Sequence, residues 1–181
     1  MIMPRGQQLL LPANPLFILF TLLLALFANM VVNISLVGNA AWMPDFLALV
    51  LVFWCVHQPR LVGIGISFFF GVATDVHQSA LLGQHALSYT ALGFMAVMVH
   101  RRLLWFTVPS QAMQVLPLFA LAHALELMVR MMSGALFPGW TIFLSPLLEA
   151  LLWPVVSVFL LAPQRRAPNP DANRPLDRKS V

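Results

Sequence analysis

The chain has 181 residues, of which 60% are hydrophobic and only 9% are charged, and its mean hydropathy is +0.86. A water-soluble domain carries roughly 25% charged residues, so this composition excludes a soluble globular protein. It predicts an integral membrane protein with one polytopic domain. The net charge of +4 does not indicate a nucleic-acid partner, because half of the basic residues follow the last apolar segment and none forms a basic helix face.

Six apolar segments follow one another along the chain, near residues 16–37, 42–57, 61–75, 83–99, 103–130 and 141–162. They predict an all-α bundle of six transmembrane helices. The first segment is longer than the core of a signal peptide, which favours a retained helix over a cleaved leader. A span needs about 20 residues, so the shorter segments include polar ends or pack inside the bundle. We expect the fifth segment to begin with an interfacial stretch around Pro109, and Pro154 to kink the sixth.

The basic residues orient this bundle. With a cytoplasmic N-terminus, nine of the ten Lys and Arg residues fall on the cytoplasmic side and only Arg130 falls outside. The positive-inside rule therefore predicts that both termini are cytoplasmic. In this prediction residues 1–162 form the membrane domain, and residues 163–181 form a disordered basic tail that contacts anionic lipid.

Small residues recur at every fourth position along the third segment. Gly63, Ser67 and Gly71 lead to Asp75, and Gly83 follows in the next turn. Such a face lets a neighbouring helix approach closely, either within the bundle or from a partner protein, and packing within the bundle is favoured for the glycines. Asp75 lies at the outer end of the segment. It either bridges the third and fourth helices or serves a function directly.

Further polar side chains lie within the apolar segments, and we name them the predicted polar seam: Asn29, Asn33, His123, Glu126, Arg130 and Glu149. Glu126 precedes Arg130 by one helical turn, which favours a local ion pair. The seam is compatible with helix–helix adhesion, with a docking groove for a partner, or with a small-molecule pocket. Asp45 follows Pro44 at a helix start, so its charge is explained by capping alone.

No arrangement of catalytic or metal-binding residues is recognisable in the sequence. It contains no glycine-rich phosphate loop and no GxSxG or HExxH motif. The single cysteine, Cys55, lies in an apolar run and is expected to be a small buried hydrophobe. We therefore predict no enzyme activity, no metal site and no cofactor.

Four stretches carry a family resemblance: PDFLALVLVFW, the HQPR turn, GIGISFFFGVATDVHQSALLGQHALSY and LLWPVV at 151–156. In this order and at this spacing they resemble the MreD family of rod shape-determining membrane proteins. The resemblance covers roughly residues 16–162, and the positions that match the family pattern are Pro44, Pro59, Gly71, Asp75, Ser79 and Gly83.

The resemblance implies a non-enzymatic scaffold of the cell-elongation machinery in the bacterial inner membrane. The implied fold is similar to the membrane-embedded substrate-binding subunits of energy-coupling-factor transporters. The implied direct partner is an MreC-like protein with one membrane helix. Indirect partners are MreB filaments and a class B penicillin-binding protein with its glycosyltransferase, through which the scaffold helps regulate peptidoglycan synthesis.

Two other functions are compatible with the residues. One is a small-solute-binding membrane subunit of a transporter, with the solute held among Asp75, Glu126 and Glu149. The other is a proton-coupled carrier, which needs a water-accessible acid and a chain of polar groups across the membrane.

Overall fold

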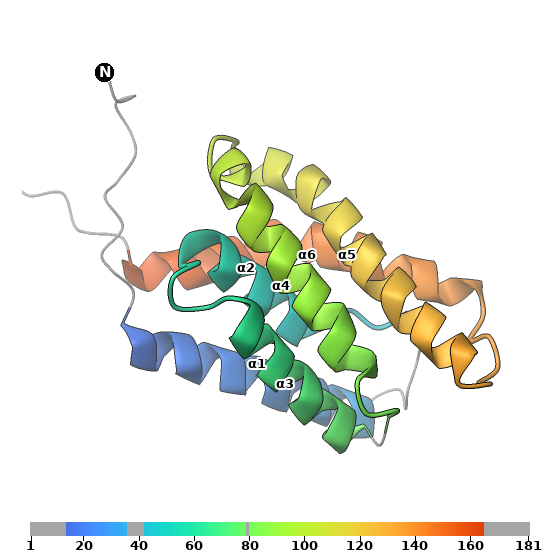
Figure 1. The fold of residues 1–181 in the computed structure, drawn as a ribbon. Coiled ribbons are helices and arrows are strands. Elements are labelled where there is room, and N and C mark those ends of the chain that lie inside the picture. The colour runs from blue at the N-terminus through green and yellow to red at the C-terminus, as the bar shows by residue number, and fades with distance from the viewer. Residues whose placement is uncertain (1–13, 36–41, 79, 165–181) are drawn as a thin grey trace, which may run out of the picture.

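The computed structural model describes residues 14–35, 42–78 and 80–164. Within these residues there are six α helices and no strand: α1 (Pro15–Ser35), α2 (Phe46–His57), α3 (Ile64–His77), α4 (Gln84–Leu103), α5 (Val108–Met132) and α6 (Leu144–Leu161). Two short 3₁₀ helices, η1 (Trp140–Phe143) and η2 (Ala162–Gln164), flank α6. The all-helical prediction is confirmed, and the six helices form one bundle (Figure 1).

Helix α2 lies at the centre of the bundle. Nine of its twelve residues are buried, because it is apolar on all sides and a helix of that kind is stable only when surrounded. It packs against α1, α4 and α6. The indole Nε1 of Trp54 donates a hydrogen bond of 2.9 Å to Thr21 Oγ1 on α1, which satisfies both polar atoms inside the core.

The outer helices are packed in chain order, with α3 against α4, α4 against α5, and α5 against α6. Short connections make these neighbours antiparallel. The C-terminal ends of α1, α3 and α5 therefore meet the N-terminal ends of α2, α4 and α6. All four acidic residues of the described chain lie at this end, which we name the acidic end. The opposite, basic end carries Arg60, Arg101 and Arg102.

Three helical segments are long and apolar enough to cross a membrane: Pro15–Val32, Val108–Met132 and Trp140–Gln164. Helices α2 and α3 are apolar but shorter, as expected of elements that pack inside a bundle. Helix α4 has 20 residues but carries more polar side chains. The structure therefore supports a membrane protein, and the number of spans stays a prediction.

The boundary between the fourth and fifth helices differs from the prediction. Leu103 belongs to the end of α4, and the break lies at residues 104–107. The predicted interfacial stretch is therefore a short turn followed by the first turn of α5, where Pro109 is tolerated because the first helical N–H groups need no partner within the helix. The predicted basic tail from residue 165 onwards lies outside the described residues.

Candidate functional site

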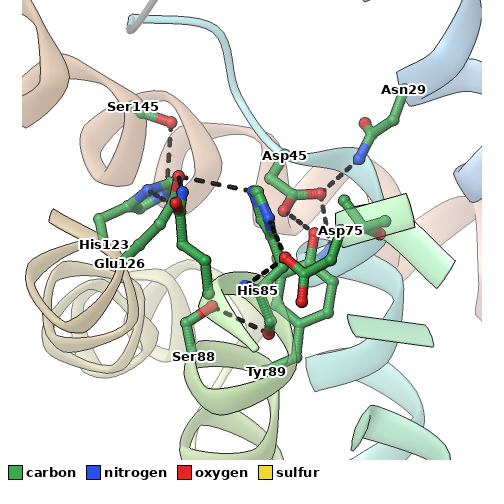
Figure 2. A network of polar contacts seen from close by, with 12 residues as sticks. Asn29, Asp45, Asp75, His85, Ser88, Tyr89, His123, Glu126 and Ser145 are labelled. Carbon is green, nitrogen blue, oxygen red and sulfur yellow. Dashed lines mark hydrogen bonds and ion pairs between the residues drawn. The ribbon is translucent and has the colours of Figure 1, made fainter. Parts of the chain in front are cut away.

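The polar side chains of the acidic end join into one network that connects all six helices (Figure 2). We name it the polar network. Its members are Asn29, Asp45, Asp75, Gln84, His85, Tyr89, His123, Glu126, Ser145 and Glu149.

The centre of the polar network is an alternating row of carboxylates and imidazoles that runs from α3 to α6. His85 Nδ1 lies 2.8 Å from Asp75 Oδ1, and His85 Nε2 lies 3.5 Å from Glu126 Oε1. His123 Nδ1 lies 3.6 Å from Glu126 Oε2, and His123 Nε2 lies 2.7 Å from Glu149 Oε1. Each imidazole therefore stands between two carboxylates, and Figure 2 shows His85 and His123 on either side of Glu126. The row crosses the bundle from helix to helix at its acidic end.

Asp75 locks the connection between α3 and α4. Its carboxylate accepts hydrogen bonds from the backbone N–H groups of Gly83 at 2.9 Å, His85 at 2.8 Å and Ala86 at 3.2 Å. These are free donors of the first turn of α4, and the helix dipole also favours a negative charge there. Gly83 adopts a φ of +105°, which permits the turn before α4. Asp75 is only 1% exposed, so it is buried within the protein and does not reach water at the membrane surface.

Asp45 joins four helices. Its side chain accepts from the N–H of Ala48 at 3.0 Å, which is the predicted cap of α2. It also accepts from Asn29 Nδ2 on α1 at 2.6 Å and from the hydroxyl of Tyr89 on α4. The backbone N–H of Asp45 donates to Glu149 Oε1 on α6 at 2.9 Å. Capping alone therefore explains only part of what this residue does.

Glu149 is fully buried and incompletely paired. Its Oε1 accepts from the N–H of Asp45, lies 3.1 Å from Ser145 Oγ, and contacts His123. Its Oε2 has no hydrogen-bond partner among the described residues. The network as a whole holds four carboxylates and two imidazoles, and no Lys or Arg of the described chain pairs with them. The polar network thus holds more acidic than basic groups.

The predicted small-residue face is used inside the chain. Ser67, Gly71 and Asp75 are buried against α4. A Cβ atom on Gly71 would lie 2.5 Å from the Cα of Ala86, so only glycine permits this approach of the two helices. Gly63 is instead the N-cap of α3, where a Cβ atom would meet the Pro59 carbonyl oxygen at an ordinary contact distance of 3.6 Å.

The predicted polar seam is brought together only in part. Asn29, His123, Glu126 and Glu149 belong to the polar network. The expected ion pair between Glu126 and Arg130 is absent from the described contacts, because the Glu126 carboxylate faces Gln84 and the two histidines. The side chains of Asn33 and Ser79 lie outside those that the structure describes.

Sequence reasoning missed Gln84, His85 and Tyr89, all on α4. His85 and Tyr89 are four residues apart and share a helix face at the start of an apolar segment. That pattern marks polar side chains that face the interior of a bundle, and it was available from the sequence.

A catalytic triad of nucleophile, base and acid would need contacts that activate its serine. Such contacts are not made by the candidate set Ser145, His123 and Glu126. Ser145 Oγ lies 3.3 Å from His123 Nε2, whereas Glu149 Oε1 lies closer to that nitrogen, at 2.7 Å. Ser145 is fully buried and donates to the carbonyl of Met43 at 2.8 Å. A nucleophile needs a base that is free to take its proton, so these contacts hold the helices together. No cluster suited to a metal ion occurs among the described residues.

Comparison with known proteins places this fold and network in a family. The family model of the rod shape-determining protein MreD matches residues 12–162. The rod shape-determining protein MreD of Haemophilus influenzae is 29% identical over 134 residues, which cover 72% of this chain and 80% of the relative. No solved structure matches the chain. Since the family model spans the whole polar network and all six helices, the chain belongs to the MreD family of rod shape-determining proteins.

Proposed function

We propose that this protein is a non-enzymatic scaffold of the cell-elongation machinery in the bacterial inner membrane. Family membership supports a role in cell shape. The finer proposal is that the bundle binds an MreC-like bitopic membrane protein and thereby helps regulate peptidoglycan synthesis. MreB filaments and a class B penicillin-binding protein with its glycosyltransferase would be reached indirectly.

The polar network is the observation that carries the scaffold proposal. Its acids and histidines bond to helix termini and to one another, and their contacts join α1 to α6 within one chain. Polar groups in hydrocarbon are costly unless paired, so such a network stabilises one arrangement of six helices. A rigid body with an apolar exterior suits a protein that presents surfaces to other membrane proteins.

The scaffold proposal is tested by depletion and copurification. We expect depleted cells to lose their rod shape, and a plasmid-borne copy to restore it. An affinity-tagged copy, solubilised in mild detergent, should copurify with the bitopic MreC-like protein of the same cell. Restored shape without any copurifying bitopic partner, in detergent or after crosslinking in membranes, would contradict the scaffold proposal.

A small-solute-binding subunit is the second candidate, and one observation favours it. Within the polar network, Oε2 of Glu149 is an acceptor without a partner among the described residues, which suits a cationic or donor solute. A fold similar to the substrate-binding subunits of energy-coupling-factor transporters would suit this role. This candidate function predicts a solute that copurifies with the protein and raises its melting temperature. It also predicts a partner ATPase. Neither is expected of a scaffold.

A further inference from the structure

A long apolar groove lies between α5 and α6. It has a volume of about 560 Å³ and runs between residues 116–131 of α5 and residues 142–147 of η1 and α6. At a rise of 1.5 Å per residue, the α5 wall is about 22 Å long, which is four helical turns. Ala120 and Ala124 lie one turn apart in this wall and leave space for the backbone of another helix. Met128 and Met131 add flexible side chains that adapt to a partner surface.

The polar network reaches this groove through His123. His123 is the only polar residue among those that line the groove, and its side chain is 16% exposed. His123 Nε2 lies 2.7 Å from Oε1 of Glu149, a fully buried residue that does not line the groove and whose Oε2 has no partner among the described residues. The apolar groove therefore borders, through His123, a buried carboxylate that has one oxygen without a hydrogen-bond partner among the described residues.

The apolar surface continues past the groove at the acidic end. In the connection between α5 and η1, Leu136 is 90% exposed, and Trp140 at the start of η1 is 81% exposed. Phe137, Trp140 and Phe143 form a row of aromatic contacts, with ring centroids 5.8 and 6.0 Å apart, that leads into the groove. An exposed tryptophan beside a membrane helix is typical of the interface between membrane and water, so the groove opens toward the membrane surface at the acidic end.

We propose that this groove docks the transmembrane helix of the bitopic partner, and that this helix places a hydrogen-bond donor or cationic side chain beside His123 and Glu149. The inference rests on the proposed scaffold function and names the surface and the chemistry of that contact. The unpaired carboxylate oxygen argues for this occupant. A lipid acyl chain fills an apolar groove but supplies no donor, whereas Oε2 of Glu149, in the side chain that contacts His123, has no donor among the described residues.

A second groove provides a matched control. It lies between α1 and α3, has a volume of about 320 Å³, and is lined by apolar residues and glycine, including Leu19, Gly65 and Phe69. Leu19 is 49% exposed, against 52% for Leu147 and 51% for Met128 in the α5–α6 groove. Positions in the two grooves are therefore equally accessible from the membrane.

Photo-crosslinking in native membranes tests the docking site. A photoreactive residue replaces Met128 or Leu147 in one groove, and Leu19 or Phe69 in the other, in the full chain coexpressed with its bitopic partner. We expect crosslinks to the partner's membrane helix from the first pair and only background from the second pair. The inference is overturned if the partner is crosslinked only from Leu19 and Phe69. It is also overturned if Met128 and Leu147 crosslink only to lipid or to a second copy of this chain. In either case, copurification of the partner would still support the scaffold proposal.

A bulky substitution in the groove tests the docking site separately from the scaffold function. Ala124→Trp fills the α5–α6 groove, and we expect it to weaken copurification of the partner about tenfold, the effect of roughly 1.4 kcal/mol. Leu19→Trp, in the other groove, should leave copurification unchanged. Equal melting temperatures of the two variants in detergent exclude misfolding as the cause. Normal partner recovery with Ala124→Trp contradicts the docking site, whereas failure of the wild-type chain to recover any partner contradicts the scaffold itself.

The donor is tested on the partner. Each polar residue of the partner's membrane helix is replaced in turn by leucine, and crosslinking from Met128 is measured. We expect one replacement to reduce the crosslink strongly, because it removes the group beside His123. Undiminished crosslinking in every variant overturns the proposed donor.

Discussion

Single residues of the polar network serve more than one helix. Asp75 is the clearest example, since its carboxylate accepts three backbone N–H groups at the start of α4 and also contacts His85. From the sequence alone, replacing Asp75 would be expected to do more harm than replacing Asp45, because a cap explains Asp45. The contacts of Asp45 with Asn29, Tyr89 and Glu149 remove the reason for that ranking.

Replacing Asp75 by alanine should destabilise the fold strongly. The change leaves three buried N–H groups of α4 without an acceptor and His85 without its partner, and each buried polar group left unpaired typically costs about 1–3 kcal/mol. Asp75→Asn keeps one oxygen and should lie between alanine and wild type. The measurement is the melting temperature of the purified protein in detergent.

Val76→Ala is the control for Asp75, because Val76 is the next residue and is 67% exposed. It should melt close to wild type. A wild-type melting temperature for Asp75→Ala would show that the carboxylate does not hold α3 and α4 together.

At the scale of elements, the close approach of α3 and α4 depends on Gly71. The two helices make the most extensive contact in the bundle, and the backbone of residues 85 and 86 lies directly against Gly71. Small residues in this position let helix backbones come close enough for dispersion and weak hydrogen bonds to hold them. The same approach brings His85 to Asp75, so helix packing and the polar network depend on each other.

Gly71→Ala should therefore loosen the bundle. Its Cβ would lie 2.5 Å from Ala86 Cα and 2.7 Å from the His85 carbonyl oxygen, both backbone atoms that cannot rotate away. Overpacking of this kind costs about 1–3 kcal/mol, which should lower the melting temperature in detergent.

Gly65→Ala on the same helix is the matched control for Gly71. A Cβ there meets nothing within 4 Å, and alanine favours a helix over glycine by about 1 kcal/mol. This variant should be as stable as wild type or slightly more stable. A larger loss for Gly65→Ala than for Gly71→Ala would refute the packing role of Gly71.

At the scale of the whole molecule, charge is divided between the two ends of the bundle. The four described acids lie at one end together with Arg130, and the other three described arginines, Arg60, Arg101 and Arg102, lie at the opposite end. The basic end should face the cytoplasm, where positive charge collects. The acidic end, with the aromatic connection between α5 and η1, should then face the outside.

Thiol labelling tests this orientation. Leu136 at the acidic end is 90% exposed and Trp105 at the basic end is 88% exposed, while the native Cys55 is buried and should not react. A membrane-impermeant maleimide should label Leu136→Cys in intact spheroplasts, and Trp105→Cys only after the membrane is permeabilised. The opposite pattern would invert the topology.

The sequence by itself determined the class of the protein and most of its elements. Apolar segments bounded by prolines and charges predicted six helices, and the family resemblance followed from motifs at fixed spacing. The cap at Asp45 was also predictable, because capping depends on neighbours within one turn. The face of small residues on α3 was predictable for the same reason, because helical periodicity depends only on residues close together in the chain.

Only the tertiary structure decided how the polar groups are paired. Asp45 and Glu149 are 104 residues apart in the chain, and Gln84 and Glu126 are 42 apart. Periodicity shows which residues share a face of one helix, but it does not show which faces meet. For that reason Glu126 was expected to pair with Arg130 within its own helix. In the folded bundle, the approach of α4 places His85 and Gln84 against Glu126, and the alternating row of acids and imidazoles results.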